Sequence, residues 1–257
     1  MKNLVCLAGA LLCGASLHAQ TQTPPAPQQE VRRKAYVRRL SLGATLSVLG
    51  LRLVPDRTTS VVTSSPAFDA IYTTTGASKR VGYGLNLQAA VTDRFAVNAS
   101  LFLRKAGYKM NSDIIEGTDD PNTSADERTL TVRNEDTRVK FYDLPVLVRY
   151  YGKDRHQRGP RWFVEGGGVL RRVSNIRTSI DTTIGTGDKQ CCDTTPRTPE
   201  RRTLRGFVAG AGVQLIDPVG IRVVPEVRYT RWAGHTFNAF STITERNQIE
   251  GMISLTF

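Results

Sequence analysis

The chain has 257 residues, a formal net charge of +12 and 40% hydrophobic residues, which is enough for one large or two small domains. No run after the first twenty residues approaches 18 consecutive apolar residues, so the sequence predicts no membrane-spanning helix. A basic excess of this size would favour a nucleic-acid partner in a cytosolic protein. The first residues of the chain argue against that compartment.

Residues 1–19 have the composition of a secretory signal peptide. Lys2 precedes an apolar run from Leu4 to Leu12, and small residues lead to Ala19, after which we expect cleavage. Residues 20–37 are rich in Pro and Gln and then basic, which predicts a disordered linker. Export argues against nucleic acid and favours an anionic lipid surface as the partner of the basic chain. The remaining residues, 38–257, form the predicted folded domain.

Eight segments of this domain alternate apolar and polar residues with the period of two that is typical of β-strands. In chain order they are 38–53, 80–91, 95–104, 138–151, 161–173, 205–215, 220–232 and 247–257. In the fourth segment the alternation slips, because Val139 and Phe141 do not share parity with Val146 and Val148. We expect a β-bulge near Asp143 and Pro145 to absorb the slip.

Short and long connections alternate between these segments. Short turns are expected at 92–94, 152–160 and 216–220, and long polar loops at 54–79, 110–137, 174–203 and 233–246. In an up-and-down sheet, alternate connections lie at the same end. One end therefore has tight turns and the other has long loops, an asymmetry typical of outer-membrane barrels.

The composition of the polar face predicts which face is inside. It carries charges of both signs and many small residues, which suit the narrow interior of an eight-stranded barrel better than a solvated surface. The glycines on this face are Gly43, Gly82, Gly84, Gly206, Gly210 and Gly212. The apolar face would then meet lipid, and we expect this of Leu42, Leu46, Leu85, Leu101, Val146, Val213 and Leu255. Tyr150, Tyr151 and Trp162 at one end, and Tyr229 and Trp232 at the other, predict aromatic girdles, although packing in a soluble core stays open for them.

Four charged residues of the polar face are expected to form an internal polar network. They are Arg149, Glu165, Glu226 and Arg228, which lie on strands that are close in sheet order. Charge-assisted hydrogen bonds inside the barrel would neutralise them.

Several stretches resemble the small outer-membrane β-barrel family, the PorT-like and OmpX/OmpA-like barrels. They are "FYDLPVLVRYYG", "RWFVEGGGVLRRV", "RGFVAGAGVQL" and "VVPEVRYTRW". The last segment, "GMISLTF", resembles the C-terminal assembly signal of such barrels. Its Gly251, Ile253, Leu255 and Phe257 would be read by the barrel-assembly machinery.

The resemblance implies an all-β fold, an eight-stranded antiparallel up-and-down transmembrane β-barrel. It places the protein in the outer membrane of a Gram-negative-type bacterium. It also implies no enzymatic activity and supplies no transferable catalytic residues.

Other candidate sites have weaker signals. His156 and His235, the latter near Thr236 and Ser241, form no acid–base–nucleophile pattern, so we predict no catalytic residues, cofactor or metal and no enzyme activity. An acidic stretch suits either Ca²⁺ or solvent, and a basic stretch suits either lipopolysaccharide phosphates or solvent. The acidic residues are Asp113, Glu116, Asp119, Asp120, Asp126 and Glu127, and the basic ones are Arg197, Arg201, Arg202 and Arg205. The adjacent Cys191 and Cys192 are free thiols, a vicinal disulfide or an intermolecular link.

We therefore expect a barrel with a structural or binding role through long extracellular loops. Eight strands leave an interior just filled by side chains, so an open pore is disfavoured. The expected partners are outer-membrane lipid and lipopolysaccharide, with no nucleic acid and no specific ligand identified. Two alternatives stay open: an outer-membrane enzyme with a site at the loop rim, and a soluble periplasmic barrel that binds an apolar ligand.

Overall fold

The computed structural model describes residues 39–64, 67–77, 80–119, 122, 126–157, 159–185, 188–193, 198–217, 220–239 and 241–257. The predicted signal peptide and linker, residues 1–37, lie outside the described residues, so they stay predictions. The described residues form β-strands and their connections. No helix in this part of the chain is long and apolar enough to cross a lipid bilayer.

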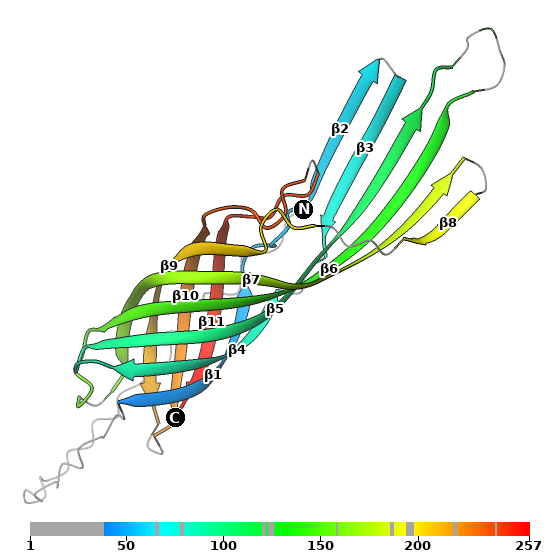
Figure 1. Ribbon diagram of the computed structural model, residues 1–257. Coiled ribbons are helices and arrows are strands. Elements are labelled where there is room, and N and C mark those ends of the chain that lie inside the picture. Colours follow the sequence, from blue (N-terminus) through cyan, green and yellow to red (C-terminus); the bar gives the residue numbers. More distant parts are fainter. Residues whose placement is uncertain are drawn as a thin grey trace, which may run out of the picture. The chain divides into compact units, whose positions relative to one another are not determined.

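Eight strands form a closed antiparallel ring (Figure 1), which confirms the predicted eight-stranded barrel. Each of the eight predicted segments overlaps one of them. They are β1 (Leu40–Leu49), β4 (Val81–Ala90), β5 (Phe95–Glu116), β6 (Thr129–Tyr151), β7 (Arg161–Ile184), β9 (Thr203–Ile216), β10 (Arg222–Trp232) and β11 (Asn247–Thr256). The ring closes where β1 pairs antiparallel with β11, from Gly43 opposite Thr256 to Leu49 opposite Glu250. The Phe257 N–H extends this ladder by donating to the Leu42 carbonyl over 2.9 Å.

Three ring strands continue past the ring into regions that the sequence predicted as loops. The distal parts of β5, β6 and β7 stay paired with one another, and β5 and β6 keep one register from Phe95 opposite Tyr150 to Glu116 opposite Thr129. Three further strands complete this layer, which we call the sheet extension. They are β2 (Arg57–Ser64), β3 (Ala67–Gly76) and β8 (Asp188–Asp193), and the order across the extension is β2-β3-β5-β6-β7-β8. The prediction of long loops was therefore wrong for much of 54–79, 110–137 and 174–203, where strands form. It was right for 233–246, where the described residues form only the bridge between Asn238 and Ile243.

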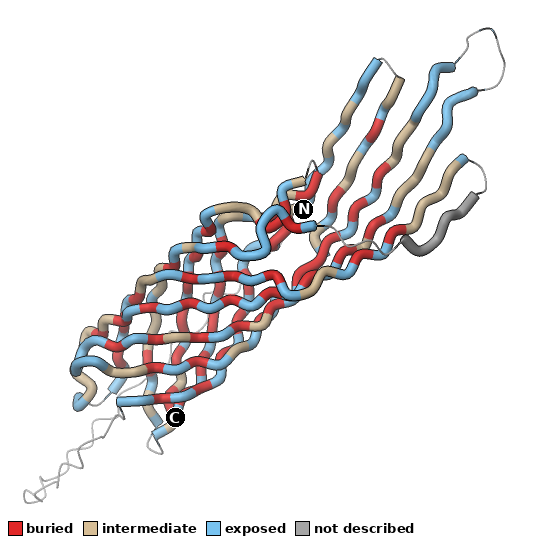
Figure 2. Tube along the Cα trace, viewed as in Figure 1, coloured by how far each residue is buried: buried red, intermediate tan, exposed pale blue. Residues whose placement is uncertain are grey.

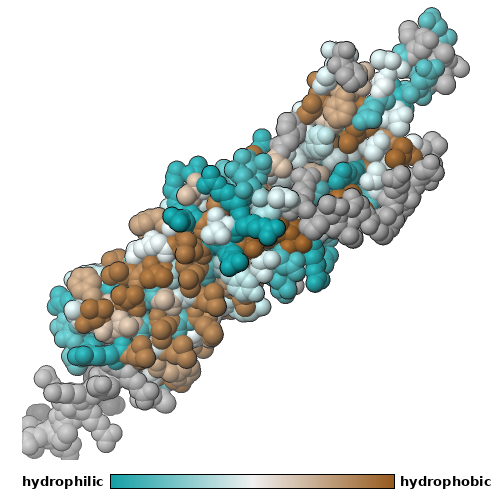
Figure 3. Space-filling model, in the orientation of Figure 1, coloured by the Kyte–Doolittle hydropathy of each residue, from teal (hydrophilic) through white to brown (hydrophobic). Residues whose placement is uncertain are grey.

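Burial alternates along the ring strands (Figure 2), without interruption in β1 and β11, and the outward side chains are mainly apolar while most buried side chains of β1 and β11 are polar. Of the seven side chains predicted to face outward, six are exposed and that of Val213 is half-buried. The six are Leu42, Leu46, Leu85, Leu101, Val146 and Leu255. Figure 3 shows the result as a hydrophobic surface over the ring strands, bordered by hydrophilic side chains toward the extension. We call this surface the apolar belt.

Strand β6 alternates without a slip, so the bulge predicted near Asp143 and Pro145 is absent there. Val139 and Phe141 face the interior, and Val146 and Val148 face outward. The irregularity lies at Lys140 and Phe141, where the register with β7 shifts. The slip was predicted because apolar residues were assigned to the outer face. Val139 and Phe141 are apolar but face the interior, on the same side of β6 as the polar Asp143 and Arg149.

Apolar clusters close both ends of the interior. Near the short turns, Ala96, Tyr151, Phe163 and Val224 pack together. At the opposite end, Leu53 and Phe237 from connections pack with ring residues in a second cluster. Tyr151 and Trp232 are buried inside the barrel, so the prediction that they belong to outer girdles was wrong.

Candidate functional site

The four residues of the predicted polar network meet inside the ring. Arg149 Nε lies 2.5 Å from Glu165 Oε2, and Arg149 Nη2 lies 2.5 Å from Glu226 Oε2. Arg228 Nε lies 2.7 Å from Glu165 Oε1 and also contacts Glu226. The two arginines and two glutamates therefore form a closed quartet of alternating charge, contributed by β6, β7 and β10.

A second set of ion pairs continues the network toward the sheet extension. Arg171 donates two hydrogen bonds of 2.7 Å to Asp143, and Arg104 Nε lies 2.8 Å from the same carboxylate. Arg104 Nη2 lies 2.5 Å from Glu250 Oε2. The sequence predicts Arg104, Arg171 and Glu250 on the inward polar face, where charges of both signs can neutralise one another, but it did not predict the ion pairs that join them with Asp143. The buried charges of the two sets balance, which removes the cost of an unpaired ion in the interior.

Large side chains pack closely around the network in the described part of the ring interior. A void lined by Arg104, Asp143, Trp232 and Glu250 among others has a volume of about 10 Å³, which is at the limit for one water molecule. Glycines make room for the large side chains. A Cβ at Gly210 would lie 3.1 Å from both Arg228 Cγ and Glu165 Oε1, and one at Gly212 would lie 2.6 Å from Phe163 Cζ.

The residues of the predicted assembly signal share the outer face of β11 and the position after it. Ile253, Leu255 and Phe257 are exposed, and a Cβ at Gly251 would meet no atom within 4 Å. Ile253 lies between Leu46 and Pro225 on the neighbouring strands. These residues are thus part of the apolar belt at the seam where the ring closes.

The histidines have separate surroundings. His156 is half-exposed in a short turn, with Nε2 3.5 Å from Asp93 Oδ1. His235 Nδ1 lies 2.6 Å from the Thr244 carbonyl oxygen, and the Ser241 hydroxyl donates to Met110 Sδ over 3.1 Å. Among the described residues neither histidine has a hydrogen bond to a hydroxyl or thiol nucleophile.

The acidic stretch divides between strands and a connection. Asp113 and Glu116 lie in β5, Asp126 pairs with Arg128 at 2.7 Å, and Asp120 lies outside the described residues. The side-chain hydrogen bond from Arg128 lowers the pKa of Asp126 to about 2. No group of carboxylates, histidines or cysteines in the described part of the chain is arranged to hold a metal ion.

The basic stretch is only partly described, because Arg197 lies outside the described residues. Arg205 is exposed on β9, two residues from Phe207 of the apolar belt. Cys191 and Cys192 belong to β8, and their side chains lie outside the described part, so the three alternatives for them stay open.

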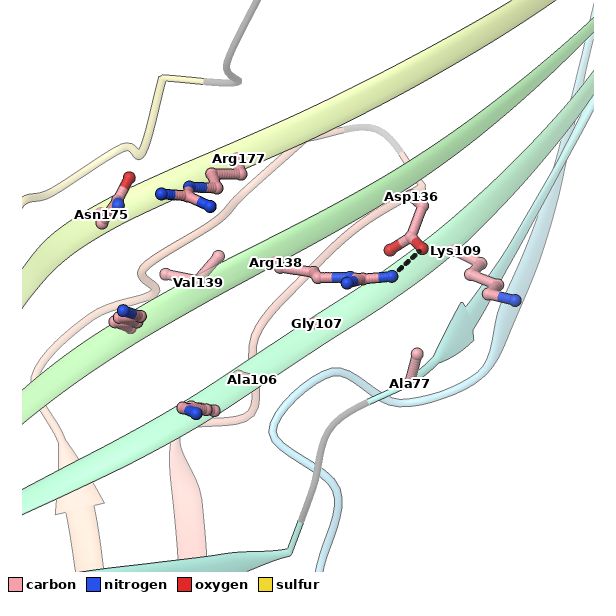
Figure 4. A pocket seen from close by; sticks show the side chains of 11 residues that line it. Ala77, Ala106, Gly107, Lys109, Asp136, Arg138, Val139, Asn175 and Arg177 are labelled. Atoms are coloured by element: carbon pink, nitrogen blue, oxygen red, sulfur yellow. Dashed lines mark hydrogen bonds and ion pairs between the residues drawn. The ribbon is translucent and has the colours of Figure 1, made fainter. Parts of the chain in front are cut away.

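Sequence periodicity did not predict a groove on the outer face of the sheet extension (Figure 4), because most of its residues come together only through the pairing of β5, β6 and β7. The groove has a volume of about 550 Å³. It is lined by Ala77, Lys105, Ala106, Gly107, Lys109, Asp136, Arg138, Val139, Lys140, Asn175 and Arg177. Five of these side chains are cations and one is a carboxylate. Arg138 Nη2 lies 3.1 Å from Asp136 Oδ2, and the Arg177 side chain lies on the neighbouring strand β7.

No protein-family model matches the chain, and no curated protein matches it. Among solved structures, LpxR from Salmonella typhimurium matches with a TM-score of 0.32 and 9% identity, over 84% of this chain and 100% of LpxR. The assignment to the PorT-like and OmpX/OmpA-like barrels stays a prediction.

The comparison contradicts one prediction. We expected a chain that is not an enzyme, whereas LpxR is an outer-membrane enzyme, and the prediction is withdrawn. Because the TM-score is 0.32 and the identity is 9%, the match transfers no site, substrate or reaction to this chain.

Proposed function

We propose that the protein is an outer-membrane barrel whose ring spans the lipid bilayer without forming an open pore, and whose sheet extension serves as a binding platform. The apolar belt carries this proposal. A soluble barrel places its apolar side chains inside, whereas this ring exposes them and buries arginines and carboxylates. The same observation disfavours a soluble barrel that binds an apolar ligand.

The height of the apolar belt supports the membrane position. On β6 the outward apolar residues run from Tyr142 to Tyr150, which at about 3.4 Å per residue is roughly 27 Å along the strand. At a strand tilt of about 40° this becomes roughly 21 Å along the barrel axis, close to the apolar band of about 25 Å in membrane barrels.

Aromatic rings border the belt at both ends. Phe95, Tyr150 and Trp162 lie on three adjacent strands near the short turns, with ring centroids 5.2 and 6.3 Å apart. Tyr83, Tyr142, Phe207 and Tyr229 are exposed toward the sheet extension. Rings that are amphipathic, such as Tyr and Trp, favour the two interfaces of a bilayer.

Fractionation and gel mobility test the proposal. The full chain, expressed with its N-terminal segment, should be recovered with outer membranes and should migrate differently in detergent before and after boiling. Purified protein in planar bilayers should give no steady conductance, because the interior is filled. Recovery in the soluble fraction, or a lasting open channel, would contradict the proposal.

A matched pair of charge insertions tests the belt itself. Leu85 is 61% exposed on the ring and Val62 is 75% exposed on the sheet extension. An arginine facing lipid near the bilayer centre costs about 2–4 kcal/mol. Leu85→Arg should therefore reduce the folded fraction on gels, whereas Val62→Arg should leave it unchanged. Equal folding of the two variants would mean that the ring does not face lipid.

A further inference from the structure

We propose that the groove on the sheet extension binds the phosphate group of an anionic lipid in the surrounding leaflet. This inference rests on the proposed function, because it needs the ring to lie in a bilayer. The ligand is a phosphate-bearing lipid such as lipid A, held by cations outside the barrel. The polar network lies inside the ring and the assembly-signal residues lie at its seam, so the groove is separate from both.

Like charges face one another directly across the groove. Lys105 on β5 lies opposite Lys140 on β6, and Arg138 on β6 lies opposite Arg177 on β7. Like charges in directly opposed cross-strand positions destabilise a sheet. Within the described part of the chain Lys105, Lys140 and Arg177 have no ion-pair partner, so an anion between the strands would relieve this repulsion.

Gly107 lines the groove and contributes no side chain to it. Gly107 lies between Lys105 and Lys109 on β5 and opposite Arg138 on β6. A Cβ at this position would lie 2.8 Å from the Thr137 carbonyl oxygen. The space above Gly107 is therefore bordered by cationic side chains from three strands, which is suitable for a phosphate group with its several acceptor oxygens.

The apolar belt begins immediately below the groove, and this indicates a lipid rather than a free anion. Leu103 lies two residues before Lys105 on β5, and the exposed Tyr142 lies two residues after Lys140 on β6. Two residues advance roughly 7 Å along a strand. An amphiphile can thus place its phosphate among the cations while its acyl chains lie against Tyr142 and Leu144.

A paired charge removal tests the site. The full chain in a neutral detergent is titrated with diphosphoryl lipid A, with the same lipid after removal of its phosphates, and with inorganic phosphate, and bound lipid is counted by native mass spectrometry. The test variant is Lys105→Gln with Lys140→Gln. The control, Arg39→Gln with Lys153→Gln, removes two exposed cations near the short-turn end. The gel shift on boiling is recorded for every sample.

The wild type and the control should bind diphosphoryl lipid A alike, and the test variant about 25-fold more weakly, at roughly fivefold for each lost cation. The dephosphorylated lipid should bind weakly to all three. Without lipid, the test variant should melt at a higher temperature than the control, because a like-charge pair is gone. If the test variant does not fold, Arg138→Gln with Arg177→Gln removes the second opposed pair and gives the same comparison.

Equal binding by the test and control variants would overturn the proposed site. Equal affinity for inorganic phosphate and lipid A would overturn the lipid as its ligand. Failure of the membrane assignment is distinguishable from both, because the wild type itself would then show no gel shift on boiling.

Discussion

At the scale of single residues, the quartet of Arg149, Glu165, Glu226 and Arg228 ties three strands of the ring together. Each carboxylate contacts both arginines, and all four side chains are buried. Buried ion pairs give little net stability against an apolar replacement of the same shape, but the loss of one partner leaves an unpaired charge. We therefore expect the quartet to specify the register of these strands more than it stabilises the barrel.

Removal of one cation tests this role. Arg149→Met leaves Glu165 and Glu226 with Arg228 alone, and we expect the free energy of unfolding to fall by about 3–5 kcal/mol. Urea unfolding of the detergent-solubilised barrel measures the change. Arg94→Gln is the control, since Arg94 pairs with Asp154 at the exposed short-turn end and should have no measurable effect. Similar losses in the two variants would show that burial of the quartet is unimportant.

At the scale of strands and hairpins, the sequence predicted the ring well and the sheet extension poorly. Ring strands separate an apolar outer side from a packed interior, so their alternation is strong. Strand β2, "RTTSVVTS", is exposed or half-buried along its whole length and so lacks an apolar face. Hydrophobic periodicity fails for a sheet that is wet on both sides. The abundance of Thr and Val in β2 was the remaining signal for a strand.

The candidate sites show the same difference between the ring and the sheet extension. The interior quartet was predictable because its members lie on the polar parity of confirmed ring strands. The groove was not, because Lys105 and Lys140 come together only through the register of β5 and β6, and Arg177 through that of β6 and β7. Sequence periodicity gives the face of each residue but not its cross-strand partner.

The base of the β2–β3 hairpin has a pH-sensitive anchor. Asp56 accepts a 2.9 Å hydrogen bond from the Gly76 N–H, and both this bond and the Arg52 guanidinium lower the pKa of Asp56. A lowered folded-state pKa stabilises the hairpin above the ordinary carboxyl pKa, and this contribution is lost as pH falls through the folded value.

Hydrogen exchange at the Gly76 amide measures this contribution. Its protection should decrease as pH falls from 6 to 2, after correction for intrinsic exchange. Asp56→Asn should have low protection at every pH. A pH-dependent loss that persists in Asp56→Asn would assign the effect to another group.

The seam of the ring is the second element with a testable property. We propose that the outer face of β11, with Gly251, Ile253, Leu255 and Phe257, is recognised during assembly. Phe257→Ala should then slow insertion without affecting export. Phe207→Ala removes an aromatic ring of similar exposure from the belt, 58% against 62%, and should insert normally. Pulse-chase analysis measures how fast each variant acquires the gel shift of the folded barrel. Equal rates for Phe257→Ala and Phe207→Ala would show that Phe257 is not specifically recognised.

At the scale of the whole molecule, charged and apolar side chains occupy different regions. The two interior sets balance their charges, the ring exposes apolar side chains, and exposed cations such as Lys140 and Arg205 lie just beyond the belt. This order matches a lipid layer bordered by anionic headgroups. A closed ring also leaves no unpaired strand edge within the bilayer.

The depth of exposed positions in a bilayer tests this account most directly. Nitroxide labels are attached at single cysteines replacing Leu85 and Val146 of the belt and Val62 and Asn111 of the sheet extension, in a background with Cys191→Ser and Cys192→Ser. In proteoliposomes the two belt labels should be relaxed by oxygen and shielded from a water-soluble nickel chelate. The two extension labels should show the reverse. Equal access of the nickel chelate to all four positions would contradict a membrane-spanning ring.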